Sequence, residues 1–188
     1  MIAPVVGLCL ALIVGGMPPS SQPLEILGTL DEREIPEASG IVKSRRYEGV
    51  FWIHNDSGNP PFLFAIRRDG SIIRRYRVEA PNLDWEDIAV DDAGHLFIGD
   101  IGNNGGRLPI RTIYQIDEPD PKRPAKEPLK VVRSSSYYFE AGRRFDAEGL
   151  FVDRGRLVLV AKTFDQRDAD LYSIPLDRPA PLLKPLLP

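Results

Sequence analysis

The sequence predicts an all-β fold, and three observations support this expectation. Short apolar runs rich in β-branched and aromatic residues recur along the 188 residues and are separated by turn-forming residues. The eighteen prolines and sixteen glycines indicate many turns. No stretch of the sequence has the apolar spacing of a long amphipathic helix. Because 43% of the residues are hydrophobic, the chain can bury a core and is expected to be globular.

Residues 1–21 are predicted to be an export signal. Val5 to Gly16 is mostly apolar but shorter than the roughly 20 residues that a membrane span needs. The first four residues carry no lysine or arginine, so an uncleaved N-terminal anchor is the alternative. Cys9, the only cysteine, lies inside this segment, so the mature chain has neither a disulfide nor a thiol nucleophile. We expect residues 22–188 to be secreted or periplasmic, with no transmembrane span.

The charge of the chain argues against nucleic-acid binding. The net charge is −3, whereas a dedicated nucleic-acid binder normally has a basic excess. Five arginines between residues 67 and 77 fall on predicted outer strands, where charge protects a solvated sheet edge. The Pro- and charge-rich segment from Asp117 to Pro128 is predicted to be an exposed loop.

Three units with a similar pattern follow one another along the chain. Each begins with a polar residue and an apolar strand, preceded two residues earlier by an acid: Glu37 before Ser39–Val42, Asp84 before Glu86–Val90, and Asp146 before Glu148–Val152. Second strands are predicted at 50–53, 96–98 and 157–160, and third strands at 62–66, 112–116 and 170–174. Fourth strands fit 72–78, then 130–133 or 137–139, and in the third unit 182–187.

Units of about 45 to 60 residues with four short strands are typical of β-propeller blades. The sequence therefore predicts about three blades, near residues 24–80, 81–140 and 141–188, which is a partial or open propeller and half of a six-bladed one. A β-sandwich with similar hairpins is the alternative. Because closure normally protects the sheet edges of a propeller, either the chain is part of a longer propeller or several copies form a homo-oligomeric ring.

Polar residues are predicted to gather on one face of the three units. In an antiparallel hairpin the start of the first strand lies beside the end of the second. This rule brings together the following residues: Glu37, Ser39, Asn55, Asp56 and Ser57; Asp84, Glu86, Asp100, Asn103 and Asn104; Asp146, Glu148, Lys162 and Thr163. Asp84 and Glu86 are two residues apart and point to the same side of an extended chain. Crowded carboxylates raise one another's pKa unless a cation offsets them.

Oxygen ligands without His or Cys suit calcium better than zinc or copper. The sequence therefore predicts a calcium site. Its expected metal ligands are Asp56, Asp84, Glu86, Asp100, Asp146 and Glu148, and its expected ligand-binding residues are Asn55, Asn103, Asn104, Lys162 and His54. Lys162 is expected to be the lone cationic group at this face. The alternative is that these acids and amides fix turns by accepting hydrogen bonds from loop amides. Trp52 and Trp85 are expected to pack between blades.

Five motifs carry a resemblance to a known family. They are Ser39-Gly40-Ile41, Trp52 to Gly58 (WIHNDSG), Asp84 to Ala89 (DWEDIA), Gly99 to Asn104 (GDIGNN) and Asp146 to Leu150 (DAEGL). Together they resemble a family of exported bacterial β-propeller proteins without an assigned activity, over residues 24–176. Members of that family are similar to longer, usually six-bladed propellers. The resemblance implies that this chain corresponds to about half of such a fold.

A weaker likeness connects Glu148 to Asp153 and Asn104 to Tyr114 with the β-propeller phytases. That resemblance implies calcium-dependent hydrolysis of phosphate esters on an acidic channel face. Glu148 maps onto the phytase pattern, with Asp100 as a second candidate. The further acids of the phytases would lie in blades outside this sequence, and no Ser-His-Asp triad with elbow spacing is present.

Three functions therefore remain open. The first is an exported binding or scaffold module with a calcium-stabilised acidic face, whose ligand is a small molecule or a phosphorylated compound. The second is a calcium-dependent phosphoesterase, in which the metal activates water. The third is an assembly protein whose open blade edges pair with other subunits. The sequence assigns no catalytic residue and leaves open whether the protein is an enzyme.

Overall fold

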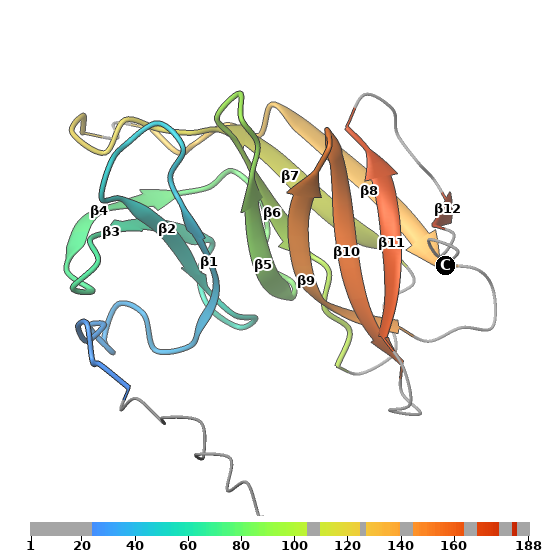
Figure 1. Ribbon diagram of the computed structural model, residues 1–188, viewed down its shortest axis with the longest axis horizontal. Helices are drawn as coiled ribbons and strands as arrows, with labels where there is room; N and C mark the ends of the chain where they lie inside the picture. Colours follow the sequence, from blue (N-terminus) through green and yellow to red (C-terminus); the bar gives the residue numbers. More distant parts are fainter. Residues whose placement is uncertain are drawn as a thin grey trace, which may run out of the picture.

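The computed structural model describes residues 24–104, 110–124, 127–139, 145–163, 169–176 and 182–183. In these ranges all regular structure is β, in twelve strands and without a helix (Figure 1). The all-β prediction is therefore confirmed. No helix among the described residues is long and apolar enough to cross a membrane. The predicted export signal lies outside the described residues.

The strands form three sheets, and all except β12 follow chain order (Figure 1). The first sheet contains β1 (Ala38–Lys43), β2 (Phe51–Asn55), β3 (Phe62–Ile66) and β4 (Ile72–Arg77). The second contains β5 (Trp85–Val90), β6 (His95–Asp100), β7 (Arg111–Asp117), β8 (Arg133–Phe139) and β12 (Leu182–Leu183). The third contains β9 (Phe145–Asp153), β10 (Arg156–Thr163) and β11 (Ala169–Pro175). All neighbours are antiparallel except β12, which pairs parallel with β8.

The strands at the end of the chain correct the prediction for the third unit. Leu182 and Leu183 were expected to add a fourth strand there, but they pair with Tyr138 and Phe139 of the second sheet. The rest of the predicted strand, residues 184–187, lies outside the described residues. In the second unit the fourth strand covers the later of the two predicted segments, 137–139, and only the last residue of the earlier one, Arg133.

The sheets pack face to face through their apolar sides. The first strand of the second sheet, β5, contacts both β1 and β9 (Figure 1). Trp52 and Trp85, both without exposed surface, belong to the cluster between the first and second sheets, as expected for packing residues. Tyr137 and Tyr172 belong to the cluster between the second and third sheets. The core therefore lies between successive sheets.

Each first strand carries an extra residue near its start, at the position where the three units align in sequence. In β5, Trp85 pairs with Asp100 and Asp87 with Gly99, which leaves Glu86 as the extra residue. In β9, Ala147 pairs with Ala161 and Gly149 with Val160, which leaves out Glu148. The shift in β1 falls between Ala38 and Ile41, at Ser39 and Gly40. Such β-bulges bend a strand and redirect its side chains, often beside functional sites.

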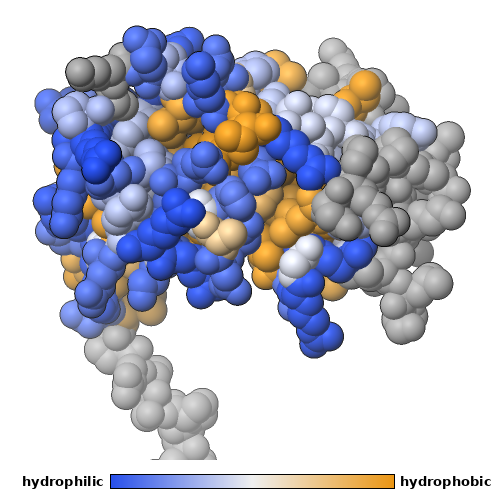
Figure 2. All heavy atoms as spheres, turned by 90° about the horizontal axis from the view of Figure 1, so that it is seen from above, coloured by the Kyte–Doolittle hydropathy of each residue, from blue (hydrophilic) through white to orange (hydrophobic). Residues whose placement is uncertain are grey.

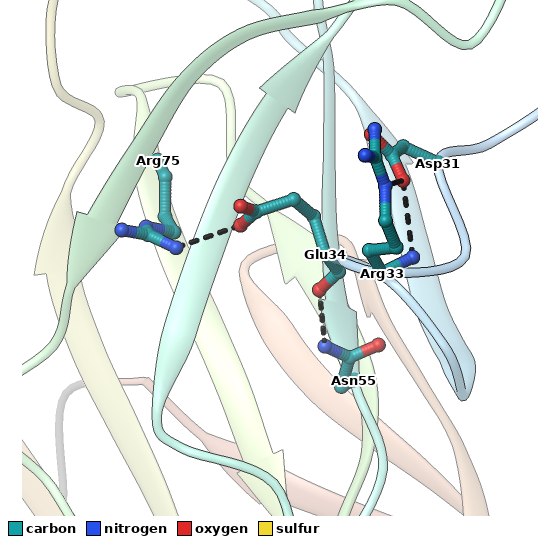
Figure 3. Close-up of polar contacts among 5 residues, drawn as sticks. All are labelled: Asp31, Arg33, Glu34, Asn55 and Arg75. Carbon is teal, nitrogen blue, oxygen red and sulfur yellow. Dashed lines mark hydrogen bonds and ion pairs between the residues drawn. The ribbon is translucent and has the colours of Figure 1, made fainter.

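The segment before β1 is fixed against the outer face of the first sheet. Ile35 lies in an apolar cluster with Ile53, Phe64 and Ile66. The Glu34 carboxylate is 2.7 Å from Arg75 Nη1 on β4, and its carbonyl accepts a hydrogen bond from Asn55 Nδ2 (Figure 3). These contacts tie the segment to both β2 and β4.

The loop after β7 is packed more closely than its polar sequence predicted. Glu118 is buried, and its Oε1 accepts hydrogen bonds from Trp52 Nε1, at 2.6 Å, and from Ser44 Oγ. The expectation of an exposed loop was therefore wrong at this residue, because the loop supplies the acceptor that the buried indole needs.

Elsewhere the surface is mixed: on the face seen in Figure 2, apolar side chains gather near the middle among hydrophilic ones.

Candidate cation site

Two groups of carboxylates, which share Glu86, lie at the starts of the first strands. In the first acid group, one oxygen of each of Asp56, Asp84 and Glu86 lies within 4.8 Å of the others. In the second acid group the same holds for Glu86, Asp146 and Glu148. We call these five residues the acidic rim. Acids from all three sheets, up to 92 positions apart in sequence (148 − 56), therefore meet at one place.

The loop after β6 holds Asp84 in place. The Asp84 N–H donates to Asp100 Oδ1 at 2.7 Å, and the Asp84 carbonyl accepts hydrogen bonds from the N–H groups of Ile101 and Gly102. A Cβ at Gly102 would lie 2.1 Å from Glu86 Oε1 and 2.5 Å from Asp84 Oδ2. A larger residue at this position would therefore displace both carboxylates, because their side chains approach the loop backbone.

Glu86 is the central member of the acidic rim. It is 8% exposed, and its Oε1 has no hydrogen-bond partner. Burial, together with the charges of the nearby carboxylates Glu148, Asp56, Asp84 and Asp146, raises the pKa of Glu86 to about 8. A buried carboxylate oxygen without a partner is costly, so this position favours either a proton or a cation.

Lys162 is the cation of the second acid group. Its Nζ lies 3.2 Å from Asp146 Oδ2 and also contacts Glu148 Oε1. Asp146 is 1% exposed, and its other oxygen accepts a hydrogen bond from the N–H of Asn103. The hydrogen bond to Glu148 is the main reason that the pKa of Lys162 is raised, so Lys162 stays charged.

Asp100 holds the backbone of Asp84, a member of the acidic rim. It is buried, and its two oxygens accept hydrogen bonds from the Asp84 N–H and, at 3.4 Å, from Tyr114 Oη. Burial raises the pKa of Asp100, while these hydrogen bonds lower it. Among the described residues it does not belong to either acid group. Its position fits the turn-fixing alternative better than the predicted ligand role.

The remaining predicted residues divide in the same way. Asn55 donates to the Glu34 carbonyl (Figure 3) and accepts the Glu37 N–H at 3.2 Å, so both ends of its amide hold the N-terminal segment. His54 has no exposed surface and packs edge-on against Trp85, and burial lowers its pKa. Asn104 is exposed; burial raises the pKa of Asp84, and a hydrogen bond from the Asn104 backbone partly offsets this rise. The side chain of Thr163 lies outside the described residues.

Sequence reasoning missed Arg111, the first residue of β7. It is 2% exposed, and burial lowers its pKa, whereas the charges of Asp146, Asp84 and Asp100 act to raise it. Lys162 is therefore not the lone cationic group near the acids, and that expectation was wrong. The sequence does show a charged residue at the start of a mostly apolar strand, but this pattern does not predict which acids Arg111 lies near.

Asp87 was missed as well. Its carboxylate accepts hydrogen bonds from the N–H of Leu150 on β9, at 2.6 Å, and from the N–H of Ile88, at 2.8 Å. It also lines a groove of about 690 Å³ between the first strands, formed by residues 41–45, 87–90 and 150–152. Asp87 therefore joins two sheets directly beside the acidic rim.

No protein-family model and no curated protein matches this chain. Among solved structures, one chain of the crystal structure of an active polycomb repressive complex 2 in the basal state is similar, with a TM-score of 0.47 and 11% sequence identity. The match covers 77% of this chain and 29% of that chain, so this chain spans less than a third of that neighbour's length. The resemblances to exported propellers and to phytases stay predictions.

Proposed function

We propose that this chain is an exported β-propeller module that binds a divalent cation, calcium, at its acidic rim and uses this face to bind a ligand. The observation that carries the proposal is the buried, unpartnered Oε1 of Glu86, the residue that belongs to both acid groups. Three sheets in series, whose first strands lie side by side, support the propeller architecture.

The spacing of the first acid group suits calcium. Oxygens bind calcium at about 2.4 Å, so two ligands of one ion can lie at most about 4.8 Å apart. The oxygens of Asp56, Asp84 and Glu86 meet this limit, and all are hard donors. Asp56 is half-buried, so an ion held here would keep coordination positions that face solvent and could accept water or a ligand oxygen.

The ligand class proposed is a small anionic or phosphorylated molecule. A calcium ion beside the half-exposed Lys162 would place two positive charges next to each other at the edge of the acidic rim. The phosphoesterase is the second candidate, because a metal in such a position can activate water. We favour binding over hydrolysis, because the sequence assigns no catalytic residue.

Calcium-dependent melting tests the proposal. The melting temperature of chelator-treated protein is expected to rise with added calcium, because an ion bound to the native state stabilises it. Glu86→Gln should abolish this rise. Glu37→Gln is the matched control, since it removes a carboxylate near the rim but outside both acid groups, and it should keep the rise. A wild-type melting temperature that does not respond to calcium, together with metal-free purified protein, would contradict the proposal.

We also propose a second copy of this chain as a partner. On β9, Leu150 and Val152 pack toward the second sheet, so Phe151 points to the opposite face of the third sheet. Phe151 and Leu171 are each 43% exposed on that face, where Leu171 pairs with Val160. The first and second sheets use the equivalent face to pack on the next sheet. A solution mass of twice the chain, reduced to one chain by Leu171→Glu, would support this partner, and a monomeric wild type would exclude it.

A further inference from the structure

We infer that Lys162 takes the place of a second cation, so that the acidic rim binds one divalent ion in the first acid group and none in the second. The inference rests on the proposed cation site and adds its stoichiometry. The acidic rim then has two cation positions. One takes the divalent ion, and the Lys162 ammonium occupies the other and so sets the stoichiometry.

The two acid groups offer the same ligands. Each contains three carboxylates with oxygens within 4.8 Å of one another, and Glu86 is common to both. Each contains a bulge glutamate at the start of a first strand, Glu86 in one and Glu148 in the other. Two cations bridged by a shared carboxylate and about 3.5–4 Å apart are a common arrangement in proteins. Ligand geometry alone therefore does not distinguish the two positions.

The two groups differ in the positive charge that they already hold. The Lys162 ammonium is 3.2 Å from Asp146 and contacts Glu148, so it sits among the oxygens where an ion would bind. In the part of the chain that the structure describes, no lysine or arginine is ion-paired with Asp56 or Asp84. The buried Arg111 interacts electrostatically with Asp84 of the first group and Asp146 of the second, so it does not distinguish them. The unpartnered oxygen belongs to Glu86, which faces both groups.

Removing the ammonium should therefore open the second position. The Lys162 side chain is 53% exposed, so an ion can reach the place it leaves. Methionine keeps the length of the stem but removes the charge. Asp146, which is 2% exposed as a side chain, and Glu148 would then lose their counter-charge, and a divalent ion would restore it.

The experiment measures bound calcium per chain, by equilibrium dialysis with metal analysis of chelator-treated protein. We expect one ion for the wild type, two for Lys162→Met and one for Lys43→Met, a control at an exposed lysine of β1 outside both acid groups. Adding Glu148→Gln to Lys162→Met should return the count to one. Near-UV circular dichroism before and after calcium shows that each variant is folded.

The number of ions bound distinguishes a failure of the inference from a failure of the proposed function. Two ions in the wild type, or one ion in both the wild type and a folded Lys162→Met, would overturn the inference and leave the proposed function standing. No ion in the wild type would overturn the proposed function and, with it, the inferred stoichiometry, whatever number Lys162→Met binds.

Discussion

Ser39 Oγ on β1 donates a hydrogen bond of 2.7 Å to the backbone carbonyl of Glu86 on β5. This contact joins the bulge of the first sheet to the bulge of the second, at the residue that both acid groups share. The position of the central carboxylate is therefore fixed from the neighbouring sheet as well as from its own strand.

Ser39→Ala should lower the free energy of unfolding by about 1 kcal/mol, since it removes one partly buried hydrogen bond. It should also weaken calcium binding, because the backbone of Glu86 loses a restraint, but it should not change the number of ions bound. Urea unfolding and calcium titration measure the two effects. Ser134→Ala, at an exposed serine of β8, is the control and should be neutral in both. An unchanged stability for Ser39→Ala would show that the inter-sheet contact contributes little.

Asp87→Ala should destabilise the protein by about 1–3 kcal/mol, because it leaves the N–H of the buried Leu150 without its acceptor between β5 and β9. Chemical denaturation provides the measurement. Asp92→Ala removes a carboxylate with a 97% exposed side chain from the β5–β6 turn and should change the stability very little. Equal losses in the two variants would mean that the Asp87 contact is not specific.

Gly102→Ala should reduce calcium affinity by at least about tenfold, or ~1.4 kcal/mol. The added methyl group would lie 2.1 Å from Glu86 Oε1 and would push both it and Asp84 out of position. Gly49→Ala separates affinity from stability, because that glycine has a φ of 72° but a Cβ there meets no atom within 4 Å. Gly49→Ala should therefore lower stability and leave calcium affinity unchanged. Isothermal titration calorimetry on both variants decides the matter.

The metal-free protein should become less stable as the pH rises from about 5 to about 8.5. The pKa of Glu86 is raised from its ordinary 4.5 to about 8, so over this range the folded state holds a proton that the unfolded state releases. The contribution of Glu86 to the free energy of unfolding is fully present below the pKa of the unfolded state. It is lost as the pH rises through the pKa of the folded state. Glu86→Gln should remove this part of the pH dependence. Urea unfolding in a chelator across this range would refute the expectation if both proteins showed the same slope.

The repeat pattern in the sequence predicted most strands because most are short apolar runs beside turn-forming residues; β8, which contains three serines, was predicted only in part. It also aligned Ser39, Glu86 and Glu148, which the structure places at the bulges of their strands. The antiparallel hairpin rule correctly placed Asp84 and Glu86 beside Asp100, since Trp85 pairs with Asp100. These features depend on the local residue pattern and on the pairing of two neighbouring strands, and both can be predicted from the sequence.

Contacts between sheets could not be predicted in the same way. Arg111, Asp87 and Glu118 find their surroundings in other units or loops, and no local pattern names those partners. The split of the acids into two groups, one of them holding Lys162, likewise depends on how far the third sheet is rotated against the second. The short strand at Leu182 joined the second sheet because the free edge of β8 lay within reach.

The three first strands share a bulge at the same place, so each sheet presents one side chain to the acidic face from an equivalent backbone position. Two of them carry glutamate there and the remaining one carries serine, on a backbone irregularity that all three share. Exchanging one residue per sheet at the bulge would therefore change the charge of this face without changing the backbone. The ion or ligand that the face prefers could change in the same way, in evolution or by design.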